Sequence, residues 1–580
     1  MSAPSSPARG PGRGRTLALL GAAFLGGLLL LALINDRVTA SARTLWVLNL
    51  SGEPLRVEVG EEKLELPSRP QPAQLRLPEG RHSIAVVDSA GATRRVEVEL
   101  EGDVLERLLG GRTFVLNLGA AAPLVWETTY YGPDAPEGMT RLSLGEVLRF
   151  ERVDHPFAPF PAEAPSGLHV RVGIQEGEPA ALLGSLPPGR RDAGALAFAA
   201  HHLRRDPSDL ALLELFVSTA RRLERSGEAL EVLRQRLAAR PVEVAWHRAY
   251  QDLRRGQGEL EALRAEYAQL AQAAPESARL AVLSARLAAD SDAAMAGYQA
   301  ALDLDPAEPW AHYGLAVHLF RRARYPEARQ HAERAQRGLP QVGACANLVY
   351  QVRCAQGEWP TLALELADAL KRRPLDFSLL RRLLEAQVGA KRLEAARESV
   401  QAYRQRIGRR APDDPRQLAL LGELTLLELK GEWEQLAAKA RALKAEELSA
   451  QLRFTAGLML QPAEVPEPSD ARGRLLRALA LGAAGAEAAA PARASALEAL
   501  AQGSPAQQAL ARVLGEESPD PQRLAPLALA PDDKAAALLV LAQTHPARRA
   551  AAVELARRYA FRRLAPGALL ERAIAQLEQE

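Results

Sequence analysis

The stretch PWAHYGLAVH, residues 309–318, holds the group of side chains that most resembles an active site. Its two imidazoles, His312 and His318, could act as general bases or as metal ligands, because histidine titrates near neutral pH and binds transition metals through a ring nitrogen. The two residues lie six positions apart, which places them about 120° apart around a helix. Metal ligands on one helix face need a spacing of three or four residues, so we expect neither a metal site nor a catalytic pair here.

No other spacing of reactive residues predicts catalysis. The chain lacks the GxxxxGK, HExxH and GxSxG patterns and has no pair of CxxC motifs. Cys345 and Cys354 lie nine positions apart on one predicted helix, so they face opposite sides of it, cannot bridge to each other and are expected to be buried thiols. His201 and His202 are expected to be solvated or to cap a helix end. We therefore predict a protein that is not an enzyme, with no catalytic residue, cofactor or metal.

The charge balance argues against nucleic acid as a partner. The chain has 73 basic and 71 acidic residues, so it has no global basic excess that would attract phosphates. Of the basic residues 7 are lysine and 66 are arginine, and this bias, with abundant Ala, Leu, Gly and Pro, is typical of GC-rich bacterial genomes. The abundant alanine and scarce aromatic residues favour closely packed helices over a large β-sandwich.

The chain begins with an apolar N-terminal segment, which precedes the elements that would position any functional site. Residues 1–15 carry three arginines and no acid, and residues 16–34 are nineteen residues without a charge, enough for a helix of about 28 Å that spans a hydrocarbon core. We predict a cytoplasmic basic tail (1–15) and one transmembrane helix (16–35), with the bulk of the chain on the outer, periplasmic side of a bacterial inner membrane. The alternative is a signal peptide cleaved after the ASA at residues 40–42, although the apolar run is longer than the usual ~7–15 residues.

Residues 43–175 are predicted to form a small antiparallel β-sandwich. Apolar and charged residues alternate in LRVEV (55–59) and RRVEVEL (94–100), a pattern of strands with one solvated face. The phrase WVLNL (46–50) returns as FVLNL (114–118), which indicates two related strand-and-turn units. LPEGRHSIAV (77–86) resembles PEGA-type β modules of bacterial surface proteins over those ten residues.

A series of prolines divides the middle of the chain at intervals of 34, 34, 31, 34 and 34 residues: Pro207, Pro241, Pro275, Pro306, Pro340 and Pro374. Alanine recurs twelve residues before the proline in three repeats, and a leucine, tyrosine or alanine stands eight residues before it. Small residues let the two helices of a hairpin approach, large ones fill the gap between hairpins, and proline ends the second helix.

These positions resemble the tetratricopeptide repeat (TPR) family. Trp310-x2-Tyr313-Gly314-x2-Val317 matches the family pattern W-x2-L-G-x2-Y, and Ala294-x3-Tyr298 matches A-x3-F. The resemblance implies an all-α, superhelical solenoid of stacked helical hairpins over residues 190–446. The predicted fold class is thus multidomain: a transmembrane helix, a small antiparallel β-sandwich and a TPR-like solenoid.

The end of the chain departs from this repeat. Residues 447–473 are expected to hold a helix end and a linker, and residues 474–580 are expected to form divergent, alanine-rich helical repeats with a cap. Within them, residues 547–580 have an amphipathic pattern that predicts a surface helix closing the solenoid.

The TPR resemblance also implies a binding surface. In the family, the first helix of each hairpin lines a concave groove that takes extended peptides or partner helices, and the matching positions here are Gln251, Arg254, Arg255, His318 and Arg353. Guanidinium groups pair well with carboxylates, so we expect protein partners with acidic or polar segments. The competing interpretation is an ordinary solvated arginine face.

The sequence therefore predicts a non-catalytic, membrane-anchored scaffold that binds or assembles protein partners in the bacterial cell envelope. One alternative is a secreted or periplasmic accessory protein released by signal cleavage. Another is an enzyme whose site lies in the β module.

Overall fold

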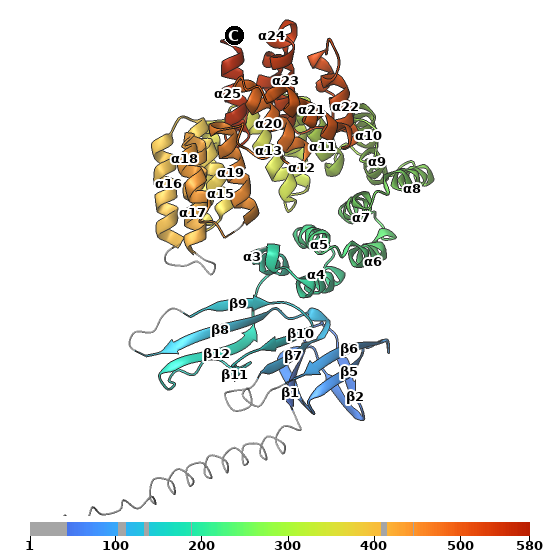
Figure 1. Cartoon of the computed structure of the whole chain (residues 1–580). Helices are drawn as coiled ribbons and strands as arrows, with labels where there is room; N and C mark the ends of the chain where they lie inside the picture. Colours follow the sequence, from blue (N-terminus) through green and yellow to red (C-terminus); the bar gives the residue numbers. More distant parts are fainter. Residues whose placement is uncertain are drawn as a thin grey trace, which may run out of the picture. The chain divides into compact units, whose positions relative to one another are not determined.

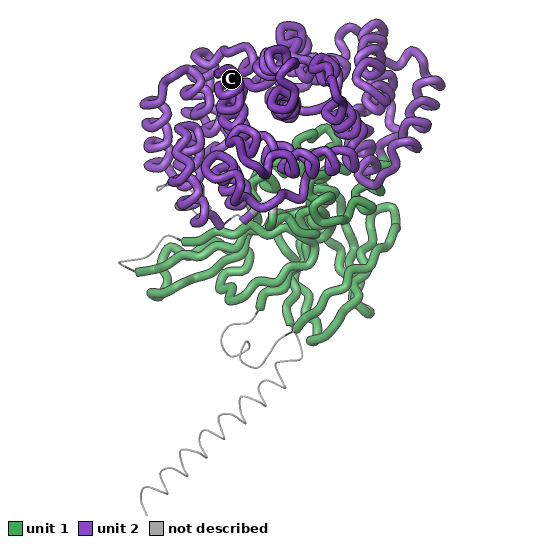
Figure 2. Tube along the Cα trace, turned by 45° about the horizontal axis from the view of Figure 1, so that its top comes forward, with its two compact units in different colours: residues 1–235 green, residues 236–580 purple. Residues whose placement is uncertain are grey.

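The structure is a computed structural model that describes residues 43–101, 112–132, 138–186, 188–407, 415–444 and 446–579. The predicted basic tail (1–15) and transmembrane helix (16–35) lie outside the described residues. Within the described ranges, no helix is both long and apolar enough to cross a membrane. The chain divides into two compact units, an N-terminal unit of residues 1–235 and a C-terminal unit of residues 236–580 (Figures 1 and 2).

The N-terminal unit begins with a β region, as the alternating sequence predicts. Its strands are β1 (Arg43–Asn49), β2 (Leu55–Val59), β3 (Glu62–Leu66), β4 (Arg69–Leu77), β5 (Gly80–Val87), β6 (Thr93–Leu100), β7 (Thr113–Asn117), β8 (Leu124–Tyr131), β9 (Thr140–Ser143), β10 (Val147–Phe150), β11 (His155–Pro156) and β12 (Gly167–Ile174). They form three four-stranded sheets, in the orders β10-β7-β1-β4, β11-β12-β8-β9 and β3-β2-β5-β6.

The prediction of an antiparallel sandwich is wrong for the centre of the first sheet. Strands β1 and β7 run parallel, with Leu45 opposite Phe114 and Leu48 opposite Asn117, and β11 and β12 are also parallel. β1 and β7 are the two copies of the VLNL phrase, so the copies lie side by side in the same direction. A parallel pair needs a long crossover instead of a tight hairpin, and the chain from β2 to β6 supplies it.

The asparagine of each VLNL copy fastens the turn that follows its strand. Asn49 and Asn117 are both buried. The Asn49 amide donates to the carbonyl oxygens of Glu53 and Leu66, each at 2.8 Å. The Asn117 amide donates to those of Ala122 and Gly145, also at 2.8 Å. A buried amide satisfied in this way joins the turn to a more distant segment, which explains why both copies keep the asparagine.

Short helices complete the N-terminal unit: η1 (Leu118–Ala120), α3 (Pro179–Ser185), η2 (Pro188–Arg190), α4 (Ala193–Arg205), α5 (Leu210–Arg222) and α6 (Ser226–Leu237). Helix α4 packs tightly on the β region at Gly194, where a Cβ atom would lie 2.3 Å from the carbonyl oxygen of Leu144. The His202 ring is hydrogen-bonded to the Ala121 carbonyl at 3.0 Å. The expectation that His202 is solvated is therefore wrong, because this ring belongs to the contact between α4 and the β region.

The C-terminal unit contains a TPR-like series of helical hairpins. Its helices as far as residue 460 are α7 (Val244–Gly256), α8 (Leu260–Ala273), α9 (Ala278–Ala285), α10 (Ser291–Leu304), α11 (Pro309–Arg321), α12 (Tyr325–Gly338), α13 (Gly343–Ala355), α14 (Trp359–Arg372), α15 (Phe377–Gly389), α16 (Leu393–Ile407), α17 (Pro415–Lys430), α18 (Trp433–Ala440) and α19 (Glu446–Leu460).

The repeated prolines end the second helix of each hairpin, as predicted. Pro275, Pro306, Pro340 and Pro374 each stand two residues beyond the last residue of α8, α10, α12 and α14, because the residue before a proline is disfavoured in a helix. The interval of 31 residues between Pro275 and Pro306 matches the short α9, which has only 8 residues.

The TPR-like motif residues pack one hairpin on the next. Tyr298 is buried on α10, and its ring lies against Gly314 of α11, where a Cβ atom would be 2.4 Å from the Tyr298 ring. Glycine at this position therefore lets the tyrosine fill the gap between hairpins. Ala328 and Ala332 of α12 are fully buried, as expected for small residues at helix crossings.

The rest of the C-terminal unit folds back onto these hairpins. Its helices are α20 (Ala471–Ala483), α21 (Ala489–Ala501), α22 (Pro505–Leu514), η3 (Pro521–Leu524), α23 (Pro531–Thr544), η4 (Pro546–Arg548), α24 (Arg549–Tyr559) and α25 (Gly567–Leu577). The expected linker before α20 buries Val465, and the expected helix over 547–580 is two helices separated by residues 560–566. Pro566 and Gly567 interrupt the helical run here.

The segment between α24 and α25 is bound by two carboxylates of the hairpins. Glu385 of α15 accepts hydrogen bonds from the Arg562 guanidinium at 2.8 and 3.0 Å and from the backbone N–H of Arg563 at 3.0 Å. Glu428 of α17 accepts from the backbone N–H of Ala565 at 2.6 Å. These contacts fix residues 562–565 against the first helices of two neighbouring hairpins.

Candidate partner-binding surface

The predicted groove residues lie on the first helices of three hairpins. Gln251, Arg254 and Arg255 are on α7, His318 is on α11 and Arg353 is on α13. The structure brings two of them, Arg255 and His318, to one cavity and places the other three outside it.

Gln251 is a packing residue in the structure and not part of a groove surface. Its side chain is 0% exposed. The amide nitrogen donates to the carbonyl oxygen of Leu283 at 3.0 Å, and the amide oxygen accepts from Arg286 at 3.0 Å. These bonds join α7 to the end of α9. Aligning the repeats by their tryptophans placed Gln251 on the correct helix. That alignment could not show that α9 covers the Gln251 side chain.

Arg254 is engaged with acidic residues of its own hairpin. Its guanidinium is 2.6 Å from Glu266 and 2.5 Å from Glu259, and it donates to the Tyr250 hydroxyl at 2.7 Å. Burial alone would lower the pKa of Arg254, but Glu259 and Tyr250 raise it above the ordinary value. A partner's carboxylate would have to compete with these groups.

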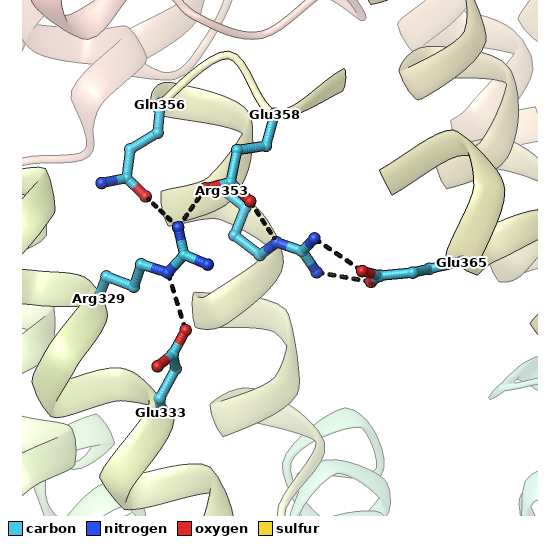
Figure 3. Close-up of polar contacts among 6 residues, drawn as sticks. All are labelled: Arg329, Glu333, Arg353, Gln356, Glu358 and Glu365. Carbon is cyan, nitrogen blue, oxygen red and sulfur yellow. Dashed lines mark hydrogen bonds and ion pairs between the residues drawn. The ribbon is translucent and has the colours of Figure 1, made fainter. Parts of the chain in front are cut away.

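Arg353 is held in the same way by acidic residues of its own hairpin, α13–α14 (Figure 3). Two of its guanidinium nitrogens bind Glu365 at 2.6 and 2.9 Å, and the third binds Glu358 at 2.9 Å. Glu358 is also paired with Arg329. Arg353 therefore stabilises the α13–α14 hairpin, and its charge is already matched.

Arg255 and His318 line a cavity of about 320 Å³ that collects arginines from three first helices. We call this cavity the arginine pocket. Arg248 and Arg255 enter it from α7, Arg286 from the end of α9, and Arg321 from α11. Asp290 is the only carboxylate among the residues that line it. Its carboxylate accepts hydrogen bonds from the backbone N–H groups of Asp292 and Ala293 at the start of α10.

Arg248 sits in the pocket on aromatic rings and not on a carboxylate. Its guanidinium carbon lies 4.4 Å from the centre of the Trp310 ring and 5.3 Å from that of Tyr313. Burial, together with the positive charge of Arg286, lowers the pKa of Arg248 to about 10. Stacking holds this planar group in place. Its charge lacks an ion-pair partner within the part of the chain that the structure describes.

Arg286 and Arg321 add positive charge to the pocket, and they differ in whether a carboxylate neutralises them. Arg286 is paired with Asp252 at 2.5 Å. Arg321 forms no ion pair with the described residues, and burial lowers its pKa. Half-buried guanidinium groups without carboxylates are unfavourable until an anion neutralises them. The arginine pocket therefore has the electrostatics of an anion-binding site.

His318 contributes a neutral ring to this pocket. Burial, with the charges of Arg321 and Arg322, lowers its pKa to about 4, and its Nδ1 is 2.8 Å from the Ser291 hydroxyl. His312 points elsewhere, since its ring is buried, with Nδ1 2.9 Å from Nδ1 of His331. The two histidines of PWAHYGLAVH are therefore separate, as their spacing predicts. Within the described residues, no group of three or more metal-ligating side chains occurs.

Sequence reasoning missed three arginines of the pocket, Arg248, Arg286 and Arg321. Helix α9 has no tryptophan and is shorter than its neighbours, so Arg286 could not be aligned with Arg255. A weaker signal was present: an arginine stands 11 to 15 residues after each of Pro241, Pro275, Pro306 and Pro340. That spacing marks the last turn of each first helix, where side chains of successive hairpins converge.

The two cysteines are buried on α13, as predicted. Burial raises the pKa of Cys345 to about 11 and that of Cys354 to about 12. Both thiols are therefore protonated at neutral pH, and neither has the environment of a reactive thiolate.

No protein-family model and no curated protein sequence matches the chain. Among solved structures, it is similar to a tetratricopeptide repeat protein from Parabacteroides merdae, with 13% identity, a TM-score of 0.28, and coverage of 42% of this chain and 98% of that chain. It is also similar to a structure of Naa15/Naa10 bound to HypK-THB, with 15% identity, a TM-score of 0.20, and coverage of 62% and 58%. Identities and TM-scores this low carry no argument about function, so the function is inferred from the arginine pocket.

Proposed function

We propose that this chain is a non-catalytic scaffold that holds protein partners by their acidic segments, at the outer face of a bacterial inner membrane. The arginine pocket carries the proposal. It gathers four guanidinium groups from three successive hairpins, and Asp290 is the only carboxylate among the residues that line it. Guanidinium groups bind carboxylates by paired hydrogen bonds, and a pocket of ~300 Å³ is at the lower end of those that enclose a ligand.

The hairpin architecture supports a protein ligand over a small ion. The pocket lies along α7, α9 and α11, so an extended segment with successive aspartates or glutamates can meet an arginine at each hairpin. Extended peptides gain affinity from such a series of contacts. Arg254 and Arg353 are less suited to this role, since both are already bound to glutamates.

Binding of a labelled hexaglutamate peptide to the full-length chain tests the proposal, with hexaglutamine as the neutral probe. We expect saturable binding of hexaglutamate alone, which weakens as salt screens the charges. The double variant Arg255→Gln/Arg321→Gln should weaken binding at least about tenfold, because each charge-assisted hydrogen bond contributes about 1.5–3 kcal/mol.

Arg337→Gln is the matched control, because Arg337 is exposed on α12 and does not line the pocket. It should leave the affinity for hexaglutamate unchanged. Equal binding of the two peptides, or equal loss in the pocket and control variants, would contradict the proposal.

The membrane location is a separate part of the proposal and rests on the uncharged run of residues 16–34. Protease added to intact spheroplasts should digest the C-terminal unit, and the protein should stay in the membrane fraction with its N-terminus uncleaved. Protection of the C-terminal unit would show the opposite topology. A mature protein that begins at Arg43 would favour the alternative of a secreted accessory protein.

A further inference from the structure

A second cavity, of about 500 Å³, lies within the N-terminal unit, between the β region and helices α4, α5 and α6. Its apolar wall includes Leu196 of α4, Phe216 of α5 and Val232 of α6, all buried. Cavities of this size that combine apolar walls with a few polar groups are typical small-molecule sites. It shares no lining residue with the arginine pocket, so what it binds is independent of the proposed function.

His201 gives this cavity a polar group without a partner. The residue lines the cavity, and its Nε2 atom is buried with no hydrogen-bond partner among the described residues. Burial, with the charges of His202 and Arg205, lowers the pKa of His201 to about 4, so the ring is neutral. A buried polar atom left unpaired is unfavourable and calls for a water or a ligand.

The ring of His201 is held in position by a close approach of the backbone. Its Nδ1 lies 3.0 Å from where a Cβ atom of Gly119 would be, and Gly119 has a φ of +68°. Glycine adopts this conformation without strain and leaves room for the ring. The expectation that His201 is solvated is therefore wrong, because the histidine is packed beside η1 and lines the cavity.

The charged residues around the cavity leave one positive charge unmatched. Arg94 is bound to Glu146 through two nitrogens, and Arg225 is bound to Glu228. Arg204 of α4 also lines the cavity, is exposed, and forms no ion pair with a described carboxylate. The cavity thus combines an apolar wall, one neutral hydrogen-bonding ring and one unpaired guanidinium.

We propose that this cavity binds a small amphipathic monocarboxylate. The apolar body of the ligand packs against Leu196, Phe216 and Val232, and its carboxylate pairs with Arg204. The neutral His201 ring forms part of the same wall. A single negative charge fits because Arg94 and Arg225 are already neutralised by glutamates.

The probe for this site is 4-phenylbutanoate, and its neutral isostere 4-phenylbutanamide tests the need for the charge. Binding to the full-length chain in lipid nanodiscs is measured by equilibrium dialysis, with empty nanodiscs subtracted. We expect saturable binding of the carboxylate and at least about tenfold weaker binding of the amide, which cannot form the charged pair. Absence of saturable carboxylate binding, or equal binding of the two probes, overturns the proposal.

Variants locate the binding in this cavity. Arg204→Gln should weaken 4-phenylbutanoate binding at least about tenfold, since it removes the charged partner. Ala197→Trp should abolish binding, because Ala197 is an exposed lining residue and an indole there fills the space. Circular dichroism confirms that each variant is folded.

Two controls complete the test. Arg221→Gln, an exposed position on α5 that does not line the cavity, should leave the affinity unchanged. Arg255→Gln/Arg321→Gln, which impairs the arginine pocket, should also leave it unchanged. Loss of 4-phenylbutanoate binding in the second control, with full binding in Arg204→Gln, would assign the probe to the arginine pocket and overturn this inference.

Discussion

Lys534 of α23 is a fully buried lysine whose ammonium group is bound by backbone carbonyls. Its Nζ donates to the carbonyl oxygens of Arg321 and Ala525, each at 2.6 Å, and lies 5.3 Å from the centre of the Tyr559 ring. Burial, with the charges of Arg321 and Arg322, lowers the pKa of Lys534 from 10.5 to about 7. This side chain joins the C-terminal helices to the end of α11, beside the arginine pocket.

The lowered pKa predicts that the protein gains stability as pH rises above 7. Between pH 7 and 9, Lys534 keeps its proton in the unfolded chain and loses it in the folded one. The unfolded chain then binds more protons, so the free energy of unfolding increases with pH, by at most about 1.4 kcal/mol per pH unit. Urea unfolding between pH 6 and 9 should show this slope in the wild type and its loss in Lys534→Met.

Lys371→Met provides the comparison for this measurement. Lys371 is exposed on α14 and paired with Asp368 at the surface, so its removal should leave the slope unchanged. Persistence of the wild-type slope in Lys534→Met would show that another group is responsible.

Some of these residue-scale features could be predicted from the sequence. Gly314 and Tyr298 stand at motif positions, and the structure packs one on the other. The burial of Gln251 could not be predicted, because it depends on Leu283 and Arg286, more than thirty residues away. A register assigns a residue to a helix face, but the partner across that face decides whether the residue is exposed.

At the scale of elements, the segment of residues 560–566 is held mainly by Glu385 of α15. This carboxylate is 1% exposed and also accepts a hydrogen bond from the Tyr350 hydroxyl at 3.0 Å. Burial would raise the pKa of Glu385, but the Arg562 guanidinium and the backbone N–H of Arg563 hold it below the ordinary value. The Glu385 carboxylate is therefore charged, buried and hydrogen-bonded, whereas the Arg562 side chain keeps 24% of its surface exposed.

Removing the charge of Glu385 alone should lower the free energy of unfolding. Glu385→Gln keeps the size of the side chain but leaves the half-buried Arg562 guanidinium without its carboxylate, which costs up to about 3 kcal/mol. We expect a lower free energy of unfolding and faster proteolysis between α24 and α25. The double variant Glu385→Gln/Arg562→Gln should recover part of the loss, and the difference measures the coupling.

Glu398→Gln is the matched control, since Glu398 is exposed on α16. Its free energy of unfolding should equal that of the wild type. If Glu385→Gln behaves like this control, the buried pair does not hold the segment.

The elements that the sequence predicted well are those with a short-range signal. Pro275, Pro306, Pro340 and Pro374 located the ends of four helices, and the shorter interval before Pro306 corresponds to the short α9. The parallel pairing of β1 with β7 and the break after α24 were missed. The strand pairing depends on a contact between distant segments, which alternation does not record. The break was missed because the helical periodicity continues across it, although Pro566 and Gly567 stand at its end.

At the scale of the C-terminal unit, the first helices differ in whether their charged side chains already bind another part of the chain. The arginine pocket gathers guanidinium groups from α7, α9 and α11. The carboxylates of Glu385 and Glu428, on α15 and α17, are bound by residues 562–565 of the same chain. An acidic partner would therefore find its complementary charges on α7, α9 and α11.

The contacts between the C-terminal helices and the hairpins are unusual for a repeat protein. In a solenoid, each repeat contacts its neighbours, so stability is close to a sum of local terms. Here Glu385 binds a residue 177 positions away, and Lys534 binds a carbonyl 213 positions away. The hairpins and the C-terminal helices should therefore unfold together more than in a simple array.

The contact of Glu385 with Arg562 has a consequence for synthesis on the ribosome. Helix α15 emerges long before its charged partner is made, and at ~5–20 residues per second the delay is on the order of 10–35 s. Until then the Glu385 carboxylate remains hydrated, and α15 and α17 cannot reach their final packing. The nascent chain must thus wait for residues 562–565 before these hairpins are complete, even though the hairpins were translated much earlier.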